Sequence, residues 1–377
     1  MKKPKTILKI MISGYYGFNN TGDEAILKSM VRVFKKKLPG VKIVVLSQNP
    51  LQTSQFYQVK AINRLHLINI LNCLRDANLF ISGGGGLLQD STGRGWSILY
   101  YLGLILGAML FRVPVMIYAQ GVGPINNRLN KLLIKWILNK IDIITVRDNP
   151  SKELLKSMGV LKPSIWVSSD ACFLLKKKSI NHIIKDFPDI LELTKSNNHP
   201  LVGISIREYK GNRTDLKRIV ARLADDIIEN YKVKIIFLPF KFDEDLYLSE
   251  EILFLMKNKS QAYILRTRIG PEELLSVISQ FSLMIGMRLH SILFSSMVNI
   301  PFIALNYDPK VKYFVEDLDL AELLLELNDF SLKIFRKKVE YVWENSDKIK
   351  KILANKIKNL EEKAIINNEL VFEILKV

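Results

Sequence analysis

The chain has 377 residues, of which 48% are hydrophobic and 24% charged, and this composition excludes a disordered or fibrous protein. Its length predicts two or three domains, each able to bury its own core. The two cysteines, Cys73 and Cys172, lie far apart, which excludes a disulfide framework and a zinc site built on cysteine pairs. Such a cysteine content is typical of a reducing, intracellular compartment.

The charge balance is strongly basic. Lys and Arg number 55 against 37 Asp and Glu, which gives a formal net charge of +18 with histidine neutral. A field of this sign favours anionic partners such as nucleic acid, an acidic membrane surface or a phosphorylated substrate. The abundance of Lys, Ile and Asn offers an equally good compositional explanation, so net charge alone does not choose the partner.

In the first half of the chain, short apolar runs alternate with helical patterns. We expect strands at Ile7–Ser13, Val41–Ser47, Leu79–Ser82, Val115–Gln120, Ile141–Val146 and Ser164–Ser168, and helices at Asp23–Lys37, Asn69–Asp76 and Asn127–Asn139. The run at Ile7 is interrupted by Lys9 and lacks a small-residue cleavage site, so we interpret it as a strand of a cytoplasmic protein and not as a signal peptide. Apolar strands that alternate with helices predict a parallel sheet covered on both faces.

The segment Trp96–Phe111 is uncharged over 16 residues. As a helix it would be about 24 Å long, short of the roughly 30 Å of a bilayer's hydrocarbon core. Its Gly103 and Gly107 form a Gly-x-x-x-Gly pair, which marks close helix contacts. We therefore expect a buried helix packed on a sheet, with a membrane-surface or oligomer contact as the alternative and a true span disfavoured.

The second half repeats the pattern with strands expected at Leu201–Arg207, Lys234–Pro239, Ala262–Leu265, Phe281–Gly286 and Phe302–Asn306. The fold class is therefore α/β, with two Rossmann-like, doubly wound domains that face a central cleft. We expect an N-terminal domain over residues 1–175, a linker over 176–200, a C-terminal domain over 201–329 and a charged helical tail over 330–377. The charges of the tail are typical of a solvated helix face.

Glycine-rich turns follow the first strands. Gly14 opens the loop YYGFNNTG, in which Asn20 is a good helix N-cap and Asp23 and Glu24 suit a helix start. The four glycines from Gly83 to Gly86 follow the third strand and can present backbone N–H groups to an anion or a sugar hydroxyl. Neither spacing fits a dinucleotide fingerprint or a P-loop. Further along, Arg147 and Asp148 end a strand, as a structural ion pair or as part of a site.

Cations follow the strands of the second half. Arg207 comes at the end of one strand, and the sequence Met287-Arg288-Leu289-His290-Ser291 connects another to a helix. A guanidinium and an imidazole at a helix N-terminus suit an anionic ligand. The segment Tyr307–Lys312 follows the next strand and adds the cations Lys310 and Lys312. No metal-binding histidine or cysteine motif and no nucleophile elbow occurs in the sequence, so we expect an anion-binding transferase site without a metal.

Six motifs occur in order along the chain: GYYGFNNTGDEA, FISGGGGLLQD, AQGVGP, SSDACF, ISIRE and GMRLHS. Together they resemble the polysaccharide pyruvyl transferases and, more closely, the CsaB-type enzymes of bacterial cell-surface anchoring. The similarity extends from about Ile7 to Phe314. The resemblance implies a GT-B-like fold with no metal or other cofactor. It also implies phosphoenolpyruvate as donor and a lipid-diphosphate-linked GlcNAc–ManNAc disaccharide as acceptor, with a 4,6-linked pyruvate ketal and phosphate as products.

The resemblance also implies roles for individual residues. Arg207, Arg288, Leu289, His290 and Lys312 would bind phosphoenolpyruvate, and Arg207, Arg288 and His290 would be catalytic, with His290 as proton donor. The acceptor would meet Gly14, Phe18, Asn20, Asp23, Gly84, Gly85 and Arg147. Asp23, Glu24 and Asp170 are candidates for the base.

The implied role is synthesis of a secondary cell-wall polymer, whose ketals anchor S-layer proteins. The enzyme would act as a peripheral protein on the anionic inner face of the cytoplasmic membrane.

Two other classes stay open at this point. A nucleotide-sugar glycosyltransferase of the same architecture would also place Arg and Lys at a diphosphate. A non-enzymatic, basic nucleic-acid-binding protein would explain the net charge. The latter reading is weaker because the sequence shows no interleaving of basic and aromatic residues and no nucleic-acid-binding module. We therefore expect no nucleic acid among the partners.

Overall fold

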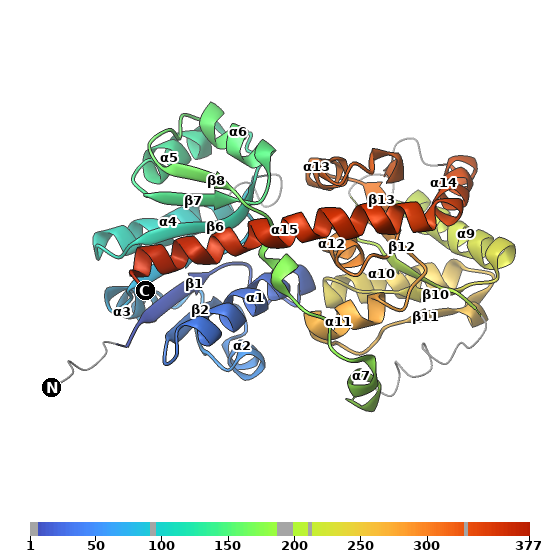
Figure 1. The fold of residues 1–377 in the computed structure, drawn as a ribbon, viewed down its shortest axis with the longest axis horizontal. Coiled ribbons are helices and arrows are strands. Elements are labelled where there is room, and N and C mark those ends of the chain that lie inside the picture. Colours follow the sequence, from blue (N-terminus) through green and yellow to red (C-terminus); the bar gives the residue numbers. More distant parts are fainter. Residues whose placement is uncertain (1–6, 91–95, 187–198, 210–212, 328–330) are drawn as a thin grey trace. The chain divides into compact units, whose positions relative to one another are not determined.

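The computed structural model describes residues 7–90, 96–186, 199–209, 213–327 and 331–377, to which all structural statements below refer. Two compact units divide the chain (Figure 1). Unit 1 combines Met1–Leu175 with Asn359–Val377, and unit 2 is Lys176–Lys358. Most of the expected linker, residues 187–198, lies outside the described residues, and α7 (Ile180–Asp186) precedes that stretch.

Unit 1 contains an eight-stranded parallel sheet in the order β3-β2-β1-β4-β6-β7-β8, with β5 paired to β6. The strands are β1 (Lys9–Ser13), β2 (Lys42–Ser47), β3 (Lys60–Asn63), β4 (Leu79–Ser82), β5 (Gly85–Leu88), β6 (Val115–Val122), β7 (Ile143–Val146) and β8 (Ser164–Val167). The helices are α1 (Thr21–Lys37), α2 (Pro50–Tyr57), α3 (Leu67–Arg75), α4 (Trp96–Leu110), α5 (Arg128–Leu138), α6 (Asn149–Ser157) and the 3₁₀ helix η2 (Ala171–Leu174).

Both faces of this sheet are buried, which explains its nearly continuous apolar strands. On one face, Met11 of β1 belongs to a core that includes side chains of α3, α4 and α5. On the other face, Ile10 and Ile12 belong to a second core with side chains of α1 and of the end of α15 (Ser346–Leu375). Alternate residues of one strand therefore anchor helices on opposite faces.

The apolar segment Trp96–Phe111 forms α4 and packs on the sheet, as expected for a buried helix. Its buried side chains include Tyr101 and Ile105. Gly107 lies against Leu74 of α3, whereas a side chain at Gly103 would meet open space. None of the helices in the described part of the chain is both long and apolar enough to cross a membrane.

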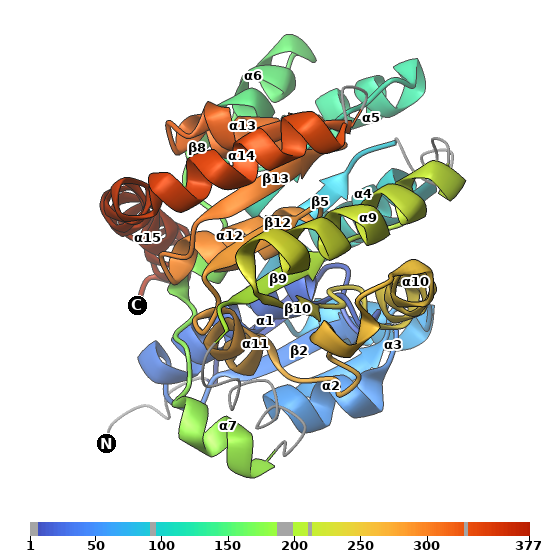
Figure 2. The ribbon, with the colours of Figure 1, turned by 90° about the vertical axis from the view of Figure 1, so that its right-hand side faces the viewer.

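Unit 2 contains a six-stranded parallel sheet in the order β11-β10-β9-β12-β13-β14 (Figure 2). The strands are β9 (Leu201–Ser205), β10 (Lys234–Phe237), β11 (Ala262–Ile264), β12 (Leu283–Gly286), β13 (Phe302–Asn306) and β14 (Leu324–Glu326). Its helices are α9 (Arg213–Tyr231), α10 (Phe242–Leu255), α11 (Pro271–Ile278), α12 (Leu289–Met297), α13 (Pro309–Asp317) and α14 (Leu332–Glu344), with η3 (Lys259–Gln261) and η4 (Ala321–Leu323). When the strands of this unit are numbered from one to six along the chain, starting at β9, their order in the sheet is 3-2-1-4-5-6, which is that of a Rossmann domain.

The expected helical tail over residues 330–377 is not a separate part. It forms α14 and α15, and the division between the units falls within α15. The last part of α15 completes unit 1, where Asn368 accepts a hydrogen bond of 2.9 Å from the Tyr118 hydroxyl and Val371 is fully buried. The charged pattern concealed this role because a helix needs only one apolar stripe to pack.

Candidate active site

Each sheet changes its winding direction beside its first strand, between β1 and β4 in unit 1 and between β9 and β12 in unit 2. In doubly wound sheets, ligands bind outside the carboxyl ends of the strands at this point. Gly14 follows β1 and Gly84 follows β4, while Arg207 follows β9 and Arg288 follows β12. The predicted site residues therefore concentrate at the switch points of the two units.

Arg288 is the N-cap of α12, and a buried carboxylate holds its side chain. Its Nε and Nη2 atoms donate hydrogen bonds of 2.6 Å each to the two carboxylate oxygens of Asp245. The side chains are only 11% and 1% exposed. Asp245 also accepts backbone N–H groups of Phe240 at 3.0 Å and Lys241 at 2.8 Å. The start of α10 thus fixes the Arg288 guanidinium above the sheet edge.

Burial alone would lower the pKa of Arg288, but the charge and hydrogen bonds of Asp245 outweigh it and raise that pKa above its ordinary value. Tyr307 and Glu244 act in the same direction. Arg288 therefore stays charged. Its two-pronged edge faces Asp245, which leaves Nη1 as the guanidinium nitrogen without a hydrogen bond to the described residues.

Tyr307, the first residue after β13, gathers cations from two elements. Its hydroxyl accepts a hydrogen bond of 3.0 Å from Arg207 Nη1, and the Arg207 guanidinium carbon lies 4.6 Å from the ring centroid. The Lys310 ammonium lies 5.6 Å from the same centroid and pairs with Asp308 at 3.1 Å. A guanidinium and an ammonium beside one aromatic ring form a strongly cationic corner.

The other predicted donor-binding residues differ in position. Leu289 and His290 begin α12 directly after Arg288, with Leu289 buried and His290 half-buried. Lys312 lies one turn into α13, and its ammonium pairs with Glu316 at 3.9 Å. Of the two lysines in this segment, Lys310 is the one that contacts the Tyr307 ring.

In unit 1, the loop between β1 and α1 is fixed by acidic side chains. Asn20 caps α1 and accepts a hydrogen bond of 3.3 Å from the Gly22 backbone. Glu24 accepts the Gly17 N–H at 2.8 Å with one oxygen and the Tyr57 hydroxyl with the other. Asp23 lies directly against Gly85, where a Cβ atom would be 2.6 Å from its carboxylate oxygen. Asp23, in the first turn of α1, therefore lies against the glycine-rich turn.

Most of the glycines in these turns have packing reasons. The ring of Tyr16, which is fully buried, occupies the space of a side chain at Gly14, and its hydroxyl occupies that of a side chain at Gly83. Gly85 has a φ of +88°, which favours glycine. Gly86 makes only ordinary contacts, with Gln89. Close packing around Tyr16 thus explains the glycines at positions 14 and 83 without a ligand.

Aromatic rings and a cation that sequence reasoning missed surround Phe18. The rings of Tyr15 and Phe18 stack at 4.0 Å with an interplanar angle of 4°. The guanidinium of Arg64 lies 5.0 Å from the Phe18 ring and 4.4 Å from the ring of Tyr100. Arg64 directly follows β3, a short half-exposed strand that the apolar pattern did not show.

Arg147 forms the ion pair with Asp148 that its sequence position suggested, with Nε 3.5 Å from the carboxylate. Its Nη1 also lies 3.3 Å from Asp170, which caps η2 through the Cys172 N–H at 3.1 Å. Burial lowers the pKa of Arg147, but Asp170 and Asp148 together raise it above its ordinary value. Asp170 is thereby held against a permanent positive charge.

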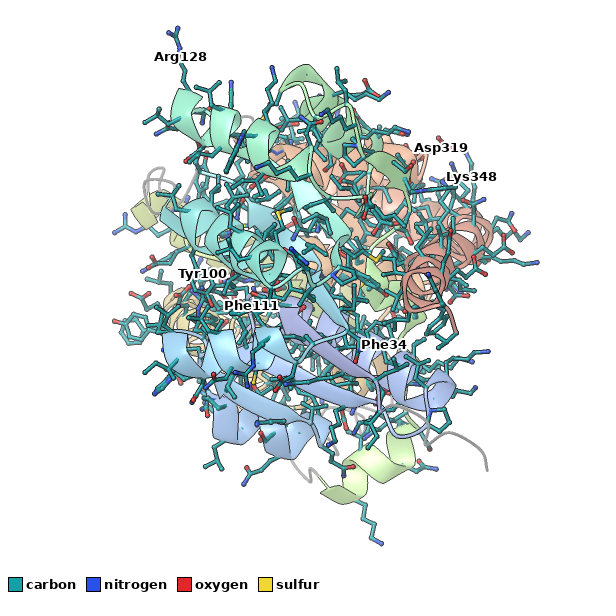
Figure 3. All side chains as sticks on the ribbon, turned by 90° about the vertical axis from the view of Figure 1, so that its left-hand side faces the viewer. Phe34, Tyr100, Phe111, Arg128, Asp319 and Lys348 are labelled. Atoms are coloured by element: carbon teal, nitrogen blue, oxygen red, sulfur yellow. The ribbon has the colours of Figure 1, made fainter. Side chains whose placement is uncertain are left out.

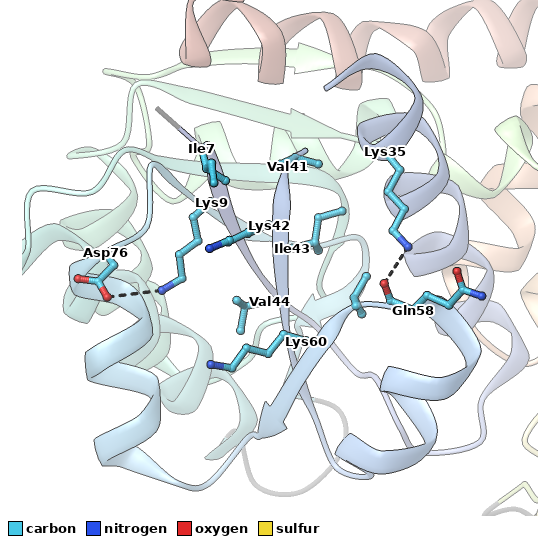
Figure 4. A pocket seen from close by; sticks show the side chains of 11 residues that line it. Ile7, Lys9, Lys35, Val41, Lys42, Ile43, Val44, Gln58, Lys60 and Asp76 are labelled. Atoms are coloured by element: carbon cyan, nitrogen blue, oxygen red, sulfur yellow. Dashed lines mark hydrogen bonds and ion pairs between the residues drawn. The ribbon is translucent and has the colours of Figure 1, made fainter. Parts of the chain in front are cut away.

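A pocket of about 750 Å³ lies at the other end of the unit 1 sheet (Figure 4). Lys9, Lys42 and Lys60, the first residues of β1, β2 and β3, line it. Lys9 pairs with Asp76 at 3.8 Å, and Lys35 donates to the carbonyl of Gln58 at 2.8 Å. This pocket is at the amino ends of the strands and is separate from the glycine-rich turns.

Comparisons with known proteins extend over nearly the whole chain. The amylovoran biosynthesis protein AmsJ of Erwinia amylovora is 19% identical, with 98% of this chain and 99% of that protein covered. A putative UDP-N-acetylglucosamine 2-epimerase from Listeria monocytogenes superimposes with a TM-score of 0.68 at 12% identity, covering 98% of this chain and 96% of the other.

A glycosyltransferase from Rickettsia africae superimposes with a TM-score of 0.62 at 13% identity, covering 98% and 99%. At such identities these structures show the fold alone, and they confirm the expected GT-B-like pair of Rossmann-like domains. The profile of the family described as polysaccharide pyruvyl transferase matches residues 20–309. This match spans most of the chain, including the glycine-rich turn at Gly83–Gly86 and Arg207, Arg288 and Tyr307 of unit 2, and the chain belongs to the polysaccharide pyruvyl transferase family of transferases.

Proposed function

We propose that this transferase uses phosphoenolpyruvate to form a 4,6-linked pyruvate ketal on the terminal N-acetylmannosamine of a lipid-diphosphate-linked GlcNAc–ManNAc disaccharide. The observation that supports phosphoenolpyruvate as the donor is the group of three cations, Arg207, Arg288 and Lys310, around Tyr307. Phosphoenolpyruvate bears both a carboxylate and a phosphate, so its binding requires several cations at one edge. The amylovoran relative supports a polysaccharide acceptor as a class.

In unit 2, Arg207 and Arg288 bind the anionic groups of the donor, Leu289 contributes its backbone, and Lys310 and Lys312 supply further positive charge. Because the forked edge of Arg288 faces Asp245, Arg288 contributes through Nη1 and through its charge. His290 begins α12, where helix N–H groups favour an anion. It also has the chemistry of a proton donor near neutral pH.

The reaction balances with one proton donor and one base. His290 protonates the methylene carbon of phosphoenolpyruvate, and the O4 hydroxyl of the sugar attacks the resulting oxocarbenium-like carbon. The C–O bond to phosphate then breaks, and the O6 hydroxyl attacks the same carbon to close the ketal. The two sugar hydroxyls lose two protons in total. The new methyl group gains one proton, through His290, and the released phosphate carries the other.

The acceptor contacts are proposed in unit 1, at Gly14, Phe18, Asn20, Asp23, Gly84, Gly85 and Arg147. The stacked rings of Tyr15 and Phe18 suit the apolar face of a sugar. The candidate bases Asp23, Glu24 and Asp170 are all buried. The position of Asp23 at Gly85 favours Asp23 as the base.

The biological setting follows from the proposed acceptor. A lipid-linked disaccharide lies in a membrane, so we place the reaction at the inner face of the cytoplasmic membrane. The ketal would then mark a secondary cell-wall polymer for the anchoring of S-layer proteins.

The test is to incubate the protein with phosphoenolpyruvate and a synthetic lipid-linked GlcNAc–ManNAc acceptor. We expect release of one phosphate for each acceptor molecule and a product heavier by one pyruvate ketal, identified by mass spectrometry. An acceptor blocked at O4 should give no product. Release of a nucleoside diphosphate from a nucleotide sugar, with no ketal from phosphoenolpyruvate, would instead support the glycosyltransferase alternative.

A further inference from the structure

Helix α5 (Arg128–Leu138) carries an exposed apolar row. One face of the helix is buried through Asn130, Ile134, Ile137 and Leu138. Leu129, Leu132, Leu133 and Trp136, at spacings of three, four and seven residues from Leu129, are 69%, 62%, 36% and 55% exposed. This spacing places them side by side along the helix. A contiguous apolar row on a surface helix marks an interaction site.

Four cations accompany this row. Arg128, Lys131 and Lys135 lie on α5, and Lys140 follows the helix, with its ammonium 3.5 Å from the centroid of the Trp136 ring. Arg128 projects outward in Figure 3. The sequence contains no Asp or Glu between Asp90 and Asp142, and Asp90, which accepts the backbone N–H groups of Asn126 and Asn127 before α5, is outnumbered by the Arg and Lys side chains of the helix.

The neighbouring helix adds apolar side chains. Helix α4 packs against α5, and Leu110 at its end is 83% exposed, followed by Phe111, which is also exposed. Figure 3 shows both helices on the side of the molecule that faces the viewer. The apolar row of α5 therefore has further apolar surface on the helix next to it.

We infer that α5 docks unit 1 onto an anionic lipid surface. Leu129, Leu132, Leu133 and Trp136 would enter the boundary between headgroups and acyl chains, where tryptophan is favoured, while the flanking Arg and Lys side chains contact anionic headgroups. Charge complementarity selects this occupant. A second copy of the chain on a two-fold axis would bring the same positive charges together, and a nucleic acid would leave the apolar row unused.

This inference rests on the membrane location in the proposed function, for which it names the docking surface, and it is tested without donor or acceptor. The full chain is floated with vesicles of phosphatidylcholine alone and with 30% phosphatidylglycerol, and the apparent Kd is compared between variants. We expect binding to the anionic vesicles that weakens with added salt. Leu132→Ser combined with Trp136→Ser should weaken it on the order of tenfold or more. Arg128→Gln combined with Lys131→Gln should weaken it about fivefold for each charge removed.

Phe254→Ser is the matched control. Phe254 of α10 is 77% exposed and also has a lysine over its ring, with the Lys259 ammonium at 4.7 Å. This variant should bind like the wild type. Circular dichroism confirms that each variant is folded, which is expected because all the substituted side chains reach the surface.

A second readout locates the contact. Brominated phosphatidylcholine in the anionic vesicles should quench the fluorescence of the wild type, and Trp136→Phe should remove the quenched component. Equal flotation of the wild type and the Leu132/Trp136 variant, or no flotation at all, would overturn the inference. The same holds if the substitutions only dissociate an oligomer in analytical ultracentrifugation. Activity on a water-soluble acceptor is measured separately, so failure of docking is distinct from failure of the proposed reaction.

Discussion

Arg288 and Asp245 form a two-pronged ion pair in which each carboxylate oxygen accepts one guanidinium N–H at 2.6 Å. The two residues are 43 positions apart in the sequence. Asp245 lies on α10, which follows β10, and Arg288 follows β12, and these two strands flank β9 in the sheet. Asp245 also accepts hydrogen bonds from two backbone N–H groups, so its carboxylate is fixed in position and orients the guanidinium. The orientation of Arg288, a proposed donor-binding residue, thus depends on a residue outside the motif GMRLHS.

Asp245→Asn should destabilise the protein and misplace Arg288. The amide keeps the volume but leaves a buried guanidinium without a counter-charge, which costs about 3–5 kcal/mol of the free energy of unfolding. The KM for phosphoenolpyruvate should rise as well. Urea unfolding and steady-state kinetics measure the two effects. Asp308→Asn removes the charge that pairs with Lys310 in an ion pair more exposed than that of Arg288 and Asp245, so it should lower the free energy of unfolding by about 1 kcal/mol or less. Equal losses in the two variants would contradict the role given to burial.

Arg288→Ala and His290→Ala should fail in different ways. Loss of Arg288 removes charge that holds the donor, so the KM for phosphoenolpyruvate should rise steeply. If His290 donates the proton, His290→Ala should lower kcat by about 10²–10⁴ with a smaller change in KM. Single-turnover rates at saturating donor separate these effects. A His290→Ala enzyme with normal kcat would restrict His290 to binding.

The sequence predicted the sheets well because their strands are buried on both faces. Leu79–Ser82 and Phe302–Asn306 are strands with the expected bounds. The strands β3 and β14 were missed because their side chains range from exposed to buried, and β5 was missed because it begins with two glycines. The positions of Arg207 and Arg288 could be predicted as well, because each charged residue comes where an apolar strand ends.

Side-chain partners were harder to predict. Asp245 belongs to the acidic start of α10, directly after a strand, and that position was the available signal. Its pairing with Arg288 needs the sheet order, since β10 and β12 flank β9 without being adjacent in sequence. The packing of Tyr16 under Gly14 and Gly83 likewise depends on contacts between two loops. Contacts of this kind join residues that are distant in the sequence, so no periodic pattern of residues indicates them.

Metal chelation should leave the activity unchanged. The proposed site neutralises its donor with Arg207, Arg288 and Lys310, whose charges do not depend on a bound ion. Turnover measured after dialysis against EDTA should equal that of the untreated enzyme. Loss of turnover that magnesium restores would overturn the expectation.

Tyr16→Phe should relieve the cost of an alanine at position 83 more than at position 14. The Cβ atom of Gly83→Ala would meet the Tyr16 hydroxyl, whereas that of Gly14→Ala would lie closest to ring carbons of Tyr16 and would also meet its hydroxyl, at 2.7 Å. We expect each alanine to destabilise the wild type by about 1–3 kcal/mol. A double-mutant cycle should give a coupling free energy above about 0.5 kcal/mol for position 83 and a smaller one for position 14. Equal coupling at both positions would contradict the assigned contacts.

Unit 1 should lose stability in alkali. Burial raises the pKa values of Tyr16, Tyr101 and Tyr118 well above the ordinary value, so these phenols ionise only when the chain unfolds. Above about pH 10 the unfolded chain therefore binds fewer protons, and the free energy of unfolding falls by about 1.4 kcal/mol per pH unit for each tyrosine. Chemical unfolding at several pH values measures this slope. Tyr118→Phe should reduce the slope by about one such increment, and an unchanged slope would count against it.

The part that α15 plays in unit 1 has a consequence for synthesis on the ribosome. Tyr118 and Ser168 find their partners in Asn368 and Asn367, 250 and 199 residues later in the chain. Phe34 likewise packs edge-on against Phe372, with ring centroids 6.5 Å apart. Unit 1 is thus the first to emerge and the last to be completed, because all of unit 2 must be translated before residues 359–377 appear. Throughout that interval the core side chains of unit 1 that pack against Leu370 and Val371 in the finished protein lack this cover.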